Sequence, residues 1–215
     1  MADAVQGRWG VIPDDELRAV AMEVRACQAC KLHLSRKNAV PGEGPATSEL
    51  MFIGEGPGFH ENEQGRPFVG AAGKYLEELL AGIGLRREQV FIGNVVKCRP
   101  PGNRDPLPEE IQACAAFLER QIQALQPRVI VTLGRFSMAR FFPSSRISDI
   151  HGQARMLNGR LVVAMYHPAA ALHQPSLRRE IEADFAQLPA LIQRAAPAAP
   201  ADPTADEPPQ QLSLF

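Results

Sequence analysis

The sequence contains no apolar run that approaches the roughly 20 residues a helix needs to cross a bilayer, so we expect no membrane-spanning helix. Its first residues, Met1-Ala2-Asp3-Ala4-Val5-Gln6, lack the basic and then apolar pattern of a secretory signal. Both absences predict a cytoplasmic protein whose thiols stay reduced. The 215 residues, 45% of them hydrophobic, suffice for one sizeable α/β domain or two small ones.

Cysteine is scarce, since the chain has only four. Cys27 and Cys30 form a Cys-x-x-Cys pair, and Cys98 and Cys114 follow far downstream. In a reducing compartment such cysteines favour a metal or cluster site over a disulfide framework. Four thiolates from three parts of the chain can hold either an iron–sulfur cluster or a structural zinc ion. The spacing therefore predicts one site that joins distant segments, and it leaves the metal open.

Basic residues are absent from Ala195 onward, where the chain has Asp202, Asp206 and Glu207. Without these three, 23 basic residues face 21 acidic ones, so the rest of the chain is slightly positive. Its basic residues form short clusters that suit either phosphate contacts or solvated loops. These clusters are Lys31, Arg36 and Lys37; Lys97, Arg99 and Arg104; and Arg178 and Arg179.

Four short apolar runs, at residues 50–53, 90–96, 129–133 and 161–165, are typical of strands buried on both faces. Helical patterns lie between and around them, including one that ends at Cys27, one that begins at Pro108 and a last one that Ser176 can cap and Pro189 can end or kink. This alternation predicts an α/β fold with three αβα layers and a central four-stranded parallel sheet. Ligands of such folds bind beyond the carboxyl ends of the strands.

Three of the four predicted strands lead into residues with functional chemistry. Gly54-Glu55-Gly56-Pro57-Gly58 follows the first strand and lets the backbone approach a ligand closely. Asn94 lies in the second strand, where a buried amide needs partners: either a ligand edge or neighbouring backbone. His167 follows the fourth strand and suits a ligand contact or a loop cap. Phe68, between glycines, is either a core aromatic or a stacking platform.

The combination of these motifs resembles the family 4 uracil-DNA glycosylases, the iron–sulfur branch of the uracil-DNA glycosylase superfamily. The resemblance covers roughly residues 12–193. It rests on Gly54-Glu55-Gly56-Pro57-Gly58, Glu61, Gly65-Arg66-Pro67-Phe68-Val69-Gly70, Asn94, His167-Pro168-Ala169-Ala170-Ala171-Leu172 and the four interleaved cysteines. It implies that uracil is flipped out of single- or double-stranded DNA and released by hydrolysis of its N-glycosidic bond.

The resemblance also implies roles for individual residues. Phe68 is expected to stack on uracil, and Asn94 to read its O4 and N3 edge. Backbone N–H groups of the turn Gly54-Glu55-Gly56 are expected to bind O2, and His167 to donate to O2 as the bond breaks. Glu61, together with Glu55, is expected to position water or to steady the sugar cation. The best-known branch of the superfamily has an Asp where this chain has Gly56, which leaves the choice of carboxylate open.

The same resemblance implies how DNA and the cofactor are held. Leu172 is expected to fill the gap left by the flipped base, with packing on the last helix as the alternative. Lys97, Arg99 and Arg104 are the expected phosphate contacts. The cysteines Cys27, Cys30, Cys98 and Cys114 are expected to bind a [4Fe–4S] cluster with a structural role, because the hydrolysis has no redox step.

The chain is expected to divide into a glycosylase domain at residues 1–195, a Pro- and Ala-rich disordered linker at 196–209 and a terminal peptide at 210–215. The segment Gln211-Leu212-Ser213-Leu214-Phe215 is similar to peptides that bind the bacterial sliding clamp, the alternative being an inert tail. Nothing in the sequence requires more than a monomer.

Two other functions fit part of this pattern. A related iron–sulfur branch binds uracil-DNA covalently through a histidine in a basic loop, but residues 97–104 here contain no histidine. The second is a non-catalytic DNA-binding module that carries a cluster and is tethered to the clamp, which the cysteines and the terminal peptide would explain. The convergence of Phe68, Asn94 and His167 on one site favours catalysis.

Overall fold

A computed structural model describes residues 13–195 of the chain. The linker predicted at 196–209 and the clamp-binding peptide predicted at 210–215 lie outside these residues. Within them, five strands form one sheet in the order β2-β1-β3-β5-β4. The strands are β1 (Leu50–Gly54), β2 (Phe91–Asn94), β3 (Val129–Leu133), β4 (Ala154–Leu157) and β5 (Arg160–Met165).

The predicted α/β class and the four parallel strands are confirmed, because β1 pairs in parallel with β2 and β3, and β3 with β5. The sheet also has an antiparallel edge strand, β4, that was not predicted. Asn158 and Gly159 connect β4 to β5 and have φ angles of 48° and 73°. Two successive positive φ angles are what a tight two-residue hairpin turn requires.

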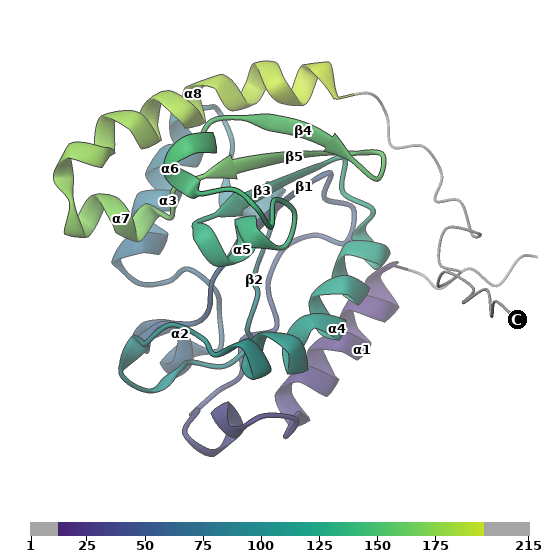
Figure 1. Ribbon diagram of the computed structural model, residues 1–215. Helices are drawn as coiled ribbons and strands as arrows, with labels where there is room; N and C mark the ends of the chain where they lie inside the picture. Colours follow the sequence, from purple (N-terminus) through teal and green to yellow (C-terminus); the bar gives the residue numbers. More distant parts are fainter. Residues whose placement is uncertain (1–12, 196–215) are drawn as a thin grey trace, which may run out of the picture.

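Helices cover both faces of the sheet and complete the three predicted layers (Figure 1). Along β1, Met51 and Ile53 pack in one core, whereas Phe52 packs in the other. The first core includes α1 (Pro13–Ala26), α4 (Pro108–Leu125), α5 (Arg135–Ala139) and α6 (Ile147–Ile150). The second includes α3 (Ala71–Gly82), α7 (Pro168–His173) and α8 (Arg178–Arg194). This alternation is the two-residue period of a strand buried on both faces.

Two ion pairs fasten α1 to α4, which lie side by side (Figure 1). The Arg120 guanidinium contacts Glu16 at 2.7 Å and Glu23 at 2.5 Å. Because α1 ends at Ala26, this contact fixes the place where Cys27 leaves the helix.

The last helix differs in detail from the prediction. Ser176 lies within a short 3-10 turn, Pro175–Leu177, and no side chain caps α8, which begins at Arg178. Pro189 lies inside α8 without ending it. Shorter elements are α2 (Phe59–Gln64) and the 3-10 turns η1 (Lys31–Leu34), η2 (Arg87–Gln89) and η3 (Pro101–Asn103). Within residues 13–195, every helix is too short or too polar to cross a membrane.

Candidate active site

The strand ends that the sequence singled out meet at the carboxyl edge of the sheet. Gly54 pairs with Asn94, and Leu133 pairs with Met165, so the loops that follow these strands are neighbours. A cavity of about 460 Å³ opens between them. It is lined by Glu55, Gly56, Pro57, Gly58, Glu61, Phe68, Ala72, Asn94, Asn103, Arg104, Asp105, His167, Ala169 and His173. The predicted base-binding residues therefore share one cavity.

Gly54 lies where Asn94 and Phe68 come together. A Cβ atom at Gly54 would lie 2.5 Å from Oδ1 of Asn94 and 2.7 Å from Cζ of Phe68. Such distances are below any normal contact, so only glycine lets the two side chains approach the strand end this closely. Gly54 thus does not line the cavity itself but leaves the space that Asn94 and Phe68 occupy in its wall.

Asn94 lines this cavity and has an unpaired polar atom. Its side chain is 2% exposed, and Oδ1 has no hydrogen-bond partner among the described residues. An unpaired buried acceptor is destabilising by about 1–3 kcal/mol. Such an atom at a cavity wall indicates a ligand that supplies the missing donor.

Phe68 has a backbone conformation that is rare for a large residue, with φ at 50°. Left-handed backbone is less stable by about 1–2 kcal/mol for a residue with a Cβ atom. Gly73 of α3 permits the conformation, because a Cβ atom there would lie 1.9 Å from the Phe68 carbonyl oxygen. The ring lies at the cavity wall against the imidazole of His167.

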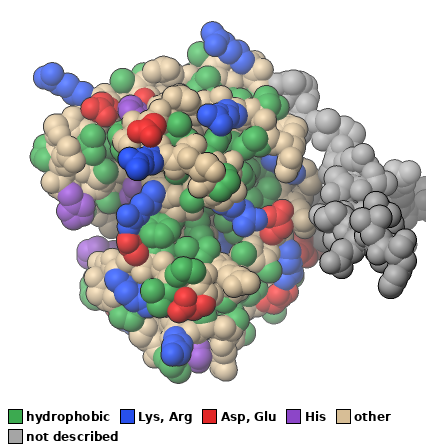
Figure 2. Space-filling view, in the orientation of Figure 1, with side chains coloured by type: hydrophobic (Ala, Val, Ile, Leu, Met, Phe, Trp, Pro, Cys, Tyr) green, Lys and Arg blue, Asp and Glu red, His purple; other side chains and the backbone are tan. Residues whose placement is uncertain are grey.

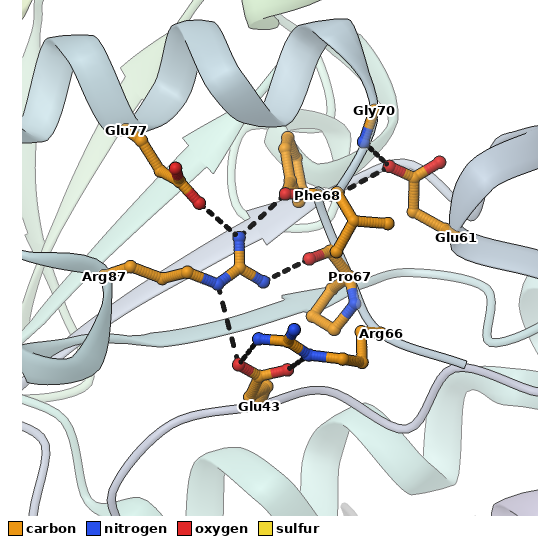
Figure 3. A network of polar contacts seen from close by, with 9 residues as sticks. Glu43, Glu61, Arg66, Pro67, Phe68, Gly70, Glu77 and Arg87 are labelled. Carbon is orange, nitrogen blue, oxygen red and sulfur yellow. Dashed lines mark hydrogen bonds and ion pairs between the residues drawn. The ribbon is translucent and has the colours of Figure 1, made fainter. Parts of the chain in front are cut away.

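Two charged side chains of opposite sign bind the backbone around Phe68 (Figure 3). Arg87 donates to the carbonyl oxygen of Phe68 at 2.7 Å and to that of Pro67. Glu61 accepts from the N–H groups of Val69 and Gly70, both at 2.8 Å. The loop that carries the ring is thus held on both sides by its main-chain polar groups.

His167 is held in one tautomer at the start of α7. Its Nδ1 accepts from the backbone N–H of Ala169 at 3.1 Å, which leaves the ring proton on Nε2. Burial lowers the pKa of His167 from 6.5 to about 4, and the nearby Glu61 carboxylate opposes this only in part. The ring is therefore neutral at physiological pH, with one N–H to donate. Gly134, with φ at 88°, leaves room for it, since a Cβ atom there would lie 3.0 Å from that of His167.

The two predicted catalytic carboxylates differ in how they are engaged. Both oxygens of Glu61 accept backbone N–H groups, because Oε2 also accepts from Gly58 at 3.1 Å. Glu55 lines the cavity, and burial raises its pKa, with Asp105 adding to the rise and Arg135 opposing it. Of the two carboxylates, Glu55 is thus the one that lines the cavity with a raised pKa, as suits a general base.

All four cysteines line one small second cavity, which confirms their predicted convergence. The Arg36 guanidinium donates to Sγ of Cys98 at 3.1 Å. Burial raises the pKa of the Cys114 thiol to about 11, although the backbone N–H of Lys97 donates to it. Within residues 13–195, no group of three or more His, Cys, Asp or Glu side chains forms a compact metal site. The cavity offers four sulfur donors in apolar surroundings, a donor set that suits zinc or an iron–sulfur cluster.

One predicted DNA contact is wrong. Lys97 is 1% exposed, and its ammonium donates to the carbonyl of Asn94 at 2.9 Å and to Gln121 at 2.6 Å. It therefore cannot meet a phosphate from this position. It braces the end of β2 against α4 instead.

The other predicted DNA contacts are accessible. Arg104 lines the cavity mouth and pairs with Glu110 at 2.7 Å, and the Arg99 guanidinium lies over the exposed Phe59 ring. Leu172 of α7 is 49% exposed, so its side chain is not packed away in the core. On the face shown in Figure 2, basic side chains are spread among other groups, several of them beside acidic ones.

Comparison with known proteins agrees with this geometry. The family described as the Uracil DNA glycosylase superfamily matches residues 41–188. The chain is 47% identical over 183 residues to the type-4 uracil-DNA glycosylase of Archaeoglobus fulgidus, an alignment that covers 81% of this chain and 92% of the relative. The type-4 enzyme of Saccharolobus solfataricus is 50% identical over 80% of this chain and 84% of its own length. That of Thermotoga maritima is 43% identical over 84% and 97%.

The chain belongs to the type-4 uracil-DNA glycosylases. As a member of this family it is a hydrolase of the N-glycosyl bond, acts on uracil-containing DNA and takes part in base excision repair. The predicted family, fold class and activity are thereby confirmed.

Sequence reasoning missed several residues of this glycosylase site. Asn103, Asp105 and His173 line the cavity from loops and a helix end where no periodic pattern marks them. Arg87 lies outside the cavity lining, in a polar stretch that reads as an exposed loop. Two of its four partners are backbone carbonyls, which no sequence pattern marks.

Proposed function

We propose that the cavity at the carboxyl edge of the sheet holds a uracil flipped out of DNA. Phe68 stacks on its ring, and the amide of Asn94 binds its O4 and N3 edge. The unpaired Oδ1 of Asn94 is the single observation that carries this proposal, because uracil N3–H is a donor and the same atom of cytosine is not. The pattern of one donor and one acceptor on the amide then matches uracil and mismatches cytosine.

Binding of uracil O2 is assigned to two kinds of donor. Backbone N–H groups of the turn Gly54-Glu55-Gly56 and the Nε2–H of His167 would face O2 as negative charge develops on the departing base. A preorganised donor of this kind is typically worth about 3–4 kcal/mol in the transition state. With its pKa near 4, His167 is neutral and keeps its single ring proton on Nε2, where it can be donated to O2.

The attacking water is assigned to Glu55 in preference to Glu61. Three backbone N–H groups already occupy the Glu61 carboxylate, whose role is then to hold the Phe68 loop. Glu55 lines the cavity, and within residues 13–195 its carboxylate has no hydrogen-bond partner that would compete with a water. An ionised Glu55 would also steady the oxocarbenium-like sugar that remains after the base departs.

The four cysteines are proposed to hold a [4Fe–4S] cluster. Their thiols line one cavity, and Arg36 and the Lys97 backbone N–H already donate to two of the sulfurs. When bound, such a cluster would link the end of α1 to the loop after β2 and to α4. Lys97 holds Asn94 in place, because its ammonium donates both to the Asn94 carbonyl and to the Gln121 side chain.

DNA is proposed to lie across the cavity mouth, with Arg99 and Arg104 near phosphates and Leu172 filling the gap in the stack. Residues 196–209 would act as a linker, and Gln211-Leu212-Ser213-Leu214-Phe215 as a peptide that binds a bacterial sliding clamp. Residues 1–195 would be the monomeric catalytic domain.

One assay tests the substrate assignment. Single- and double-stranded oligonucleotides that carry uracil, cytosine, thymine or hypoxanthine at one position are incubated with enzyme, and abasic sites are counted. We expect release of uracil and retention of cytosine. If protein with its full iron content left uracil-DNA intact, catalysis would be refuted. An SDS-stable adduct between the protein and uracil-DNA would indicate covalent trapping instead.

A further inference from the structure

Arg87 lies in η2, just before β2, and does not line the cavity. Its side chain is nevertheless only 9% exposed. A buried guanidinium requires partners for its N–H groups. Two of them are the successive carbonyl oxygens of Pro67 and Phe68 (Figure 3).

Two carboxylates form ion pairs with this guanidinium, whose Nε makes no hydrogen bond within residues 13–195. Glu77 of α3 lies 3.4 Å from Nη1, and Glu43, in the loop before β1, lies 3.6 Å from Nε. Glu43 is held in turn by Arg66, with two hydrogen bonds of 2.7 and 2.6 Å. Carboxylates from two separate parts of the fold therefore hold Arg87 in the position from which it binds the two carbonyls.

The contacts of Arg87 and Glu61 complement one another. Arg87 binds the carbonyls of residues 67 and 68, and Glu61 binds the N–H groups of residues 69 and 70. Four consecutive residues are thus fixed through their backbone, with the left-handed Phe68 in the middle. An unfavourable backbone conformation persists only when its surroundings over-determine it.

We propose that Arg87 is a positioning residue for uracil recognition: it holds the Phe68 backbone in its left-handed conformation and so aims the ring at the flipped base. Arg87 acts through Phe68 and touches no reacting atom. This inference rests on the stacking role proposed for Phe68.

The geometry requires arginine rather than any cation. One planar guanidinium reaches two successive carbonyls and two carboxylates at once, whereas an ammonium group is a point charge without this fork. Arg87→Lys should therefore rescue little of the function lost in Arg87→Gln.

Arg128 provides a matched control. It also joins a carboxylate and a backbone carbonyl, with Nη1 at 2.9 Å from Glu49 and Nη2 at 2.6 Å from the Ala195 oxygen. It directly precedes β3, so it lies at the amino edge of the sheet, away from the cavity. Arg128→Gln reports what the loss of a partly buried arginine does to folding alone.

The experiment measures four quantities on Arg87→Gln, Arg87→Lys, Arg128→Gln and Phe68→Ala: Tm, kcat, inhibition by free uracil, and affinity for DNA with a tetrahydrofuran abasic analogue. For both Arg87 variants we expect kcat to fall by about 100-fold, because a small misplacement of a contact group has effects of this size. The inhibition constant of uracil should rise by up to about tenfold, the worth of a stacking contact. Abasic DNA has no base to stack, so its affinity should stay within about twofold of the wild-type value. A tenfold change in affinity corresponds to about 1.4 kcal/mol, so a twofold change is small.

The outcomes separate the possible roles. Arg128→Gln should lower Tm without changing uracil inhibition, which would show that a loss of stability alone does not weaken uracil binding. If uracil inhibition changes for Phe68→Ala but not for Arg87→Gln, the positioning role is overturned while stacking stands. If Phe68→Ala leaves uracil inhibition unchanged, stacking itself fails, and this inference fails with it.

Discussion

The imidazole of His167 lies against the ring of Phe68, with centroids 5.4 Å apart and ring planes 26° apart. The group proposed to stack on uracil and the group proposed to donate to it are thus in direct contact. A displacement of either ring would be transmitted to the other, because close-packed side chains have few alternative positions. Base recognition and bond cleavage are therefore expected to respond together to changes in this wall.

Replacement of His167 by alanine, which removes the N–H donor, should slow excision by about 100- to 1,000-fold, as loss of one oxyanion donor does. Binding to uracil-DNA should change only a few fold, since the contact strengthens in the transition state. Single-turnover excision and binding to a non-cleavable uracil analogue check the two parts. Equal losses in both would contradict a transition-state role.

The same residue makes a pH prediction. With a folded pKa near 4 against an ordinary 6.5, the unfolded chain binds more protons than the folded one between these values. Stability should consequently fall as pH drops from 6.5 towards 4, and this component should vanish in His167→Gln. Urea unfolding of both proteins at several pH values measures the difference. Parallel curves for the two proteins would show that the imidazole is not buried as described.

Substitution of Asn94 by aspartate should reduce uracil excision by at least about 100-fold, because a carboxylate repels uracil O4 and has no N–H group to donate to it. The same change should raise the ratio of cytosine to uracil release, since a carboxylate accepts from the cytosine amino group. Product analysis on matched oligonucleotides checks both. An unchanged base preference would remove Asn94 from base reading.

Glu55→Gln and Glu61→Gln should separate chemistry from loop support. Glu55→Gln should lower kcat by about 100-fold, the usual contribution of a general base, with little change in Tm. Burial raises the pKa of Glu55, so the wild-type rate should increase with pH as this carboxylate ionises above its usual range. That limb of the pH–rate profile should be missing in Glu55→Gln.

Glu61→Gln should instead lower Tm, because a neutral amide is a weaker acceptor for three backbone N–H groups. Its pH–rate profile should keep the wild-type shape. If Glu61→Gln abolishes the pH-dependent limb and Glu55→Gln retains it, the two assignments must be exchanged.

Cys98→Ser should lose bound iron and sulfide, measured chemically and by visible absorption. Hydrogen exchange should then increase at the end of α1 and in the loop after β2, the segments that a cluster would join. Arg36→Gln, which removes the donor to Cys98 together with a hydrogen bond to the Arg25 carbonyl, should retain iron but release it faster to a chelator. Full iron content in Cys98→Ser would exclude this cysteine as a ligand.

Deletion of residues 211–215 should abolish association with a purified bacterial sliding clamp and leave excision on short oligonucleotides within about twofold, because a linear peptide carries its affinity in a few side chains. Phe215→Ala offers a matched change of a single aromatic. Clamp binding by the truncated protein would refute the docking peptide.

Much of the fold could be predicted because its parallel strands are buried on both faces and appear as continuous apolar runs. Strand β4 could not be found this way, since none of its residues is buried and it lies at the sheet edge. The Asn158-Gly159 pair that follows it is nonetheless a strong hairpin signal, and it could have been used.

The cavity lining was predictable where a polar residue type stands at or just after a strand end, as for Glu55, Asn94 and His167. The site was not predictable where function depends on direction. Lys97 shares a basic stretch with Arg99 and Arg104 but turns inward to the Asn94 carbonyl. Arg87 binds backbone atoms, whose positions depend on the whole fold rather than on any sequence pattern.

The cavity draws its walls from distant parts of the chain, since Glu55 and His167 lie about half the sequence apart and meet only at the completed sheet edge. Contacts of such long range form late, after most loop-closure entropy has been lost. Catalysis should thus appear only with the last step of folding. The return of excision activity during refolding can therefore report when the native sheet is complete. Spectroscopic signals of helix formation should appear earlier.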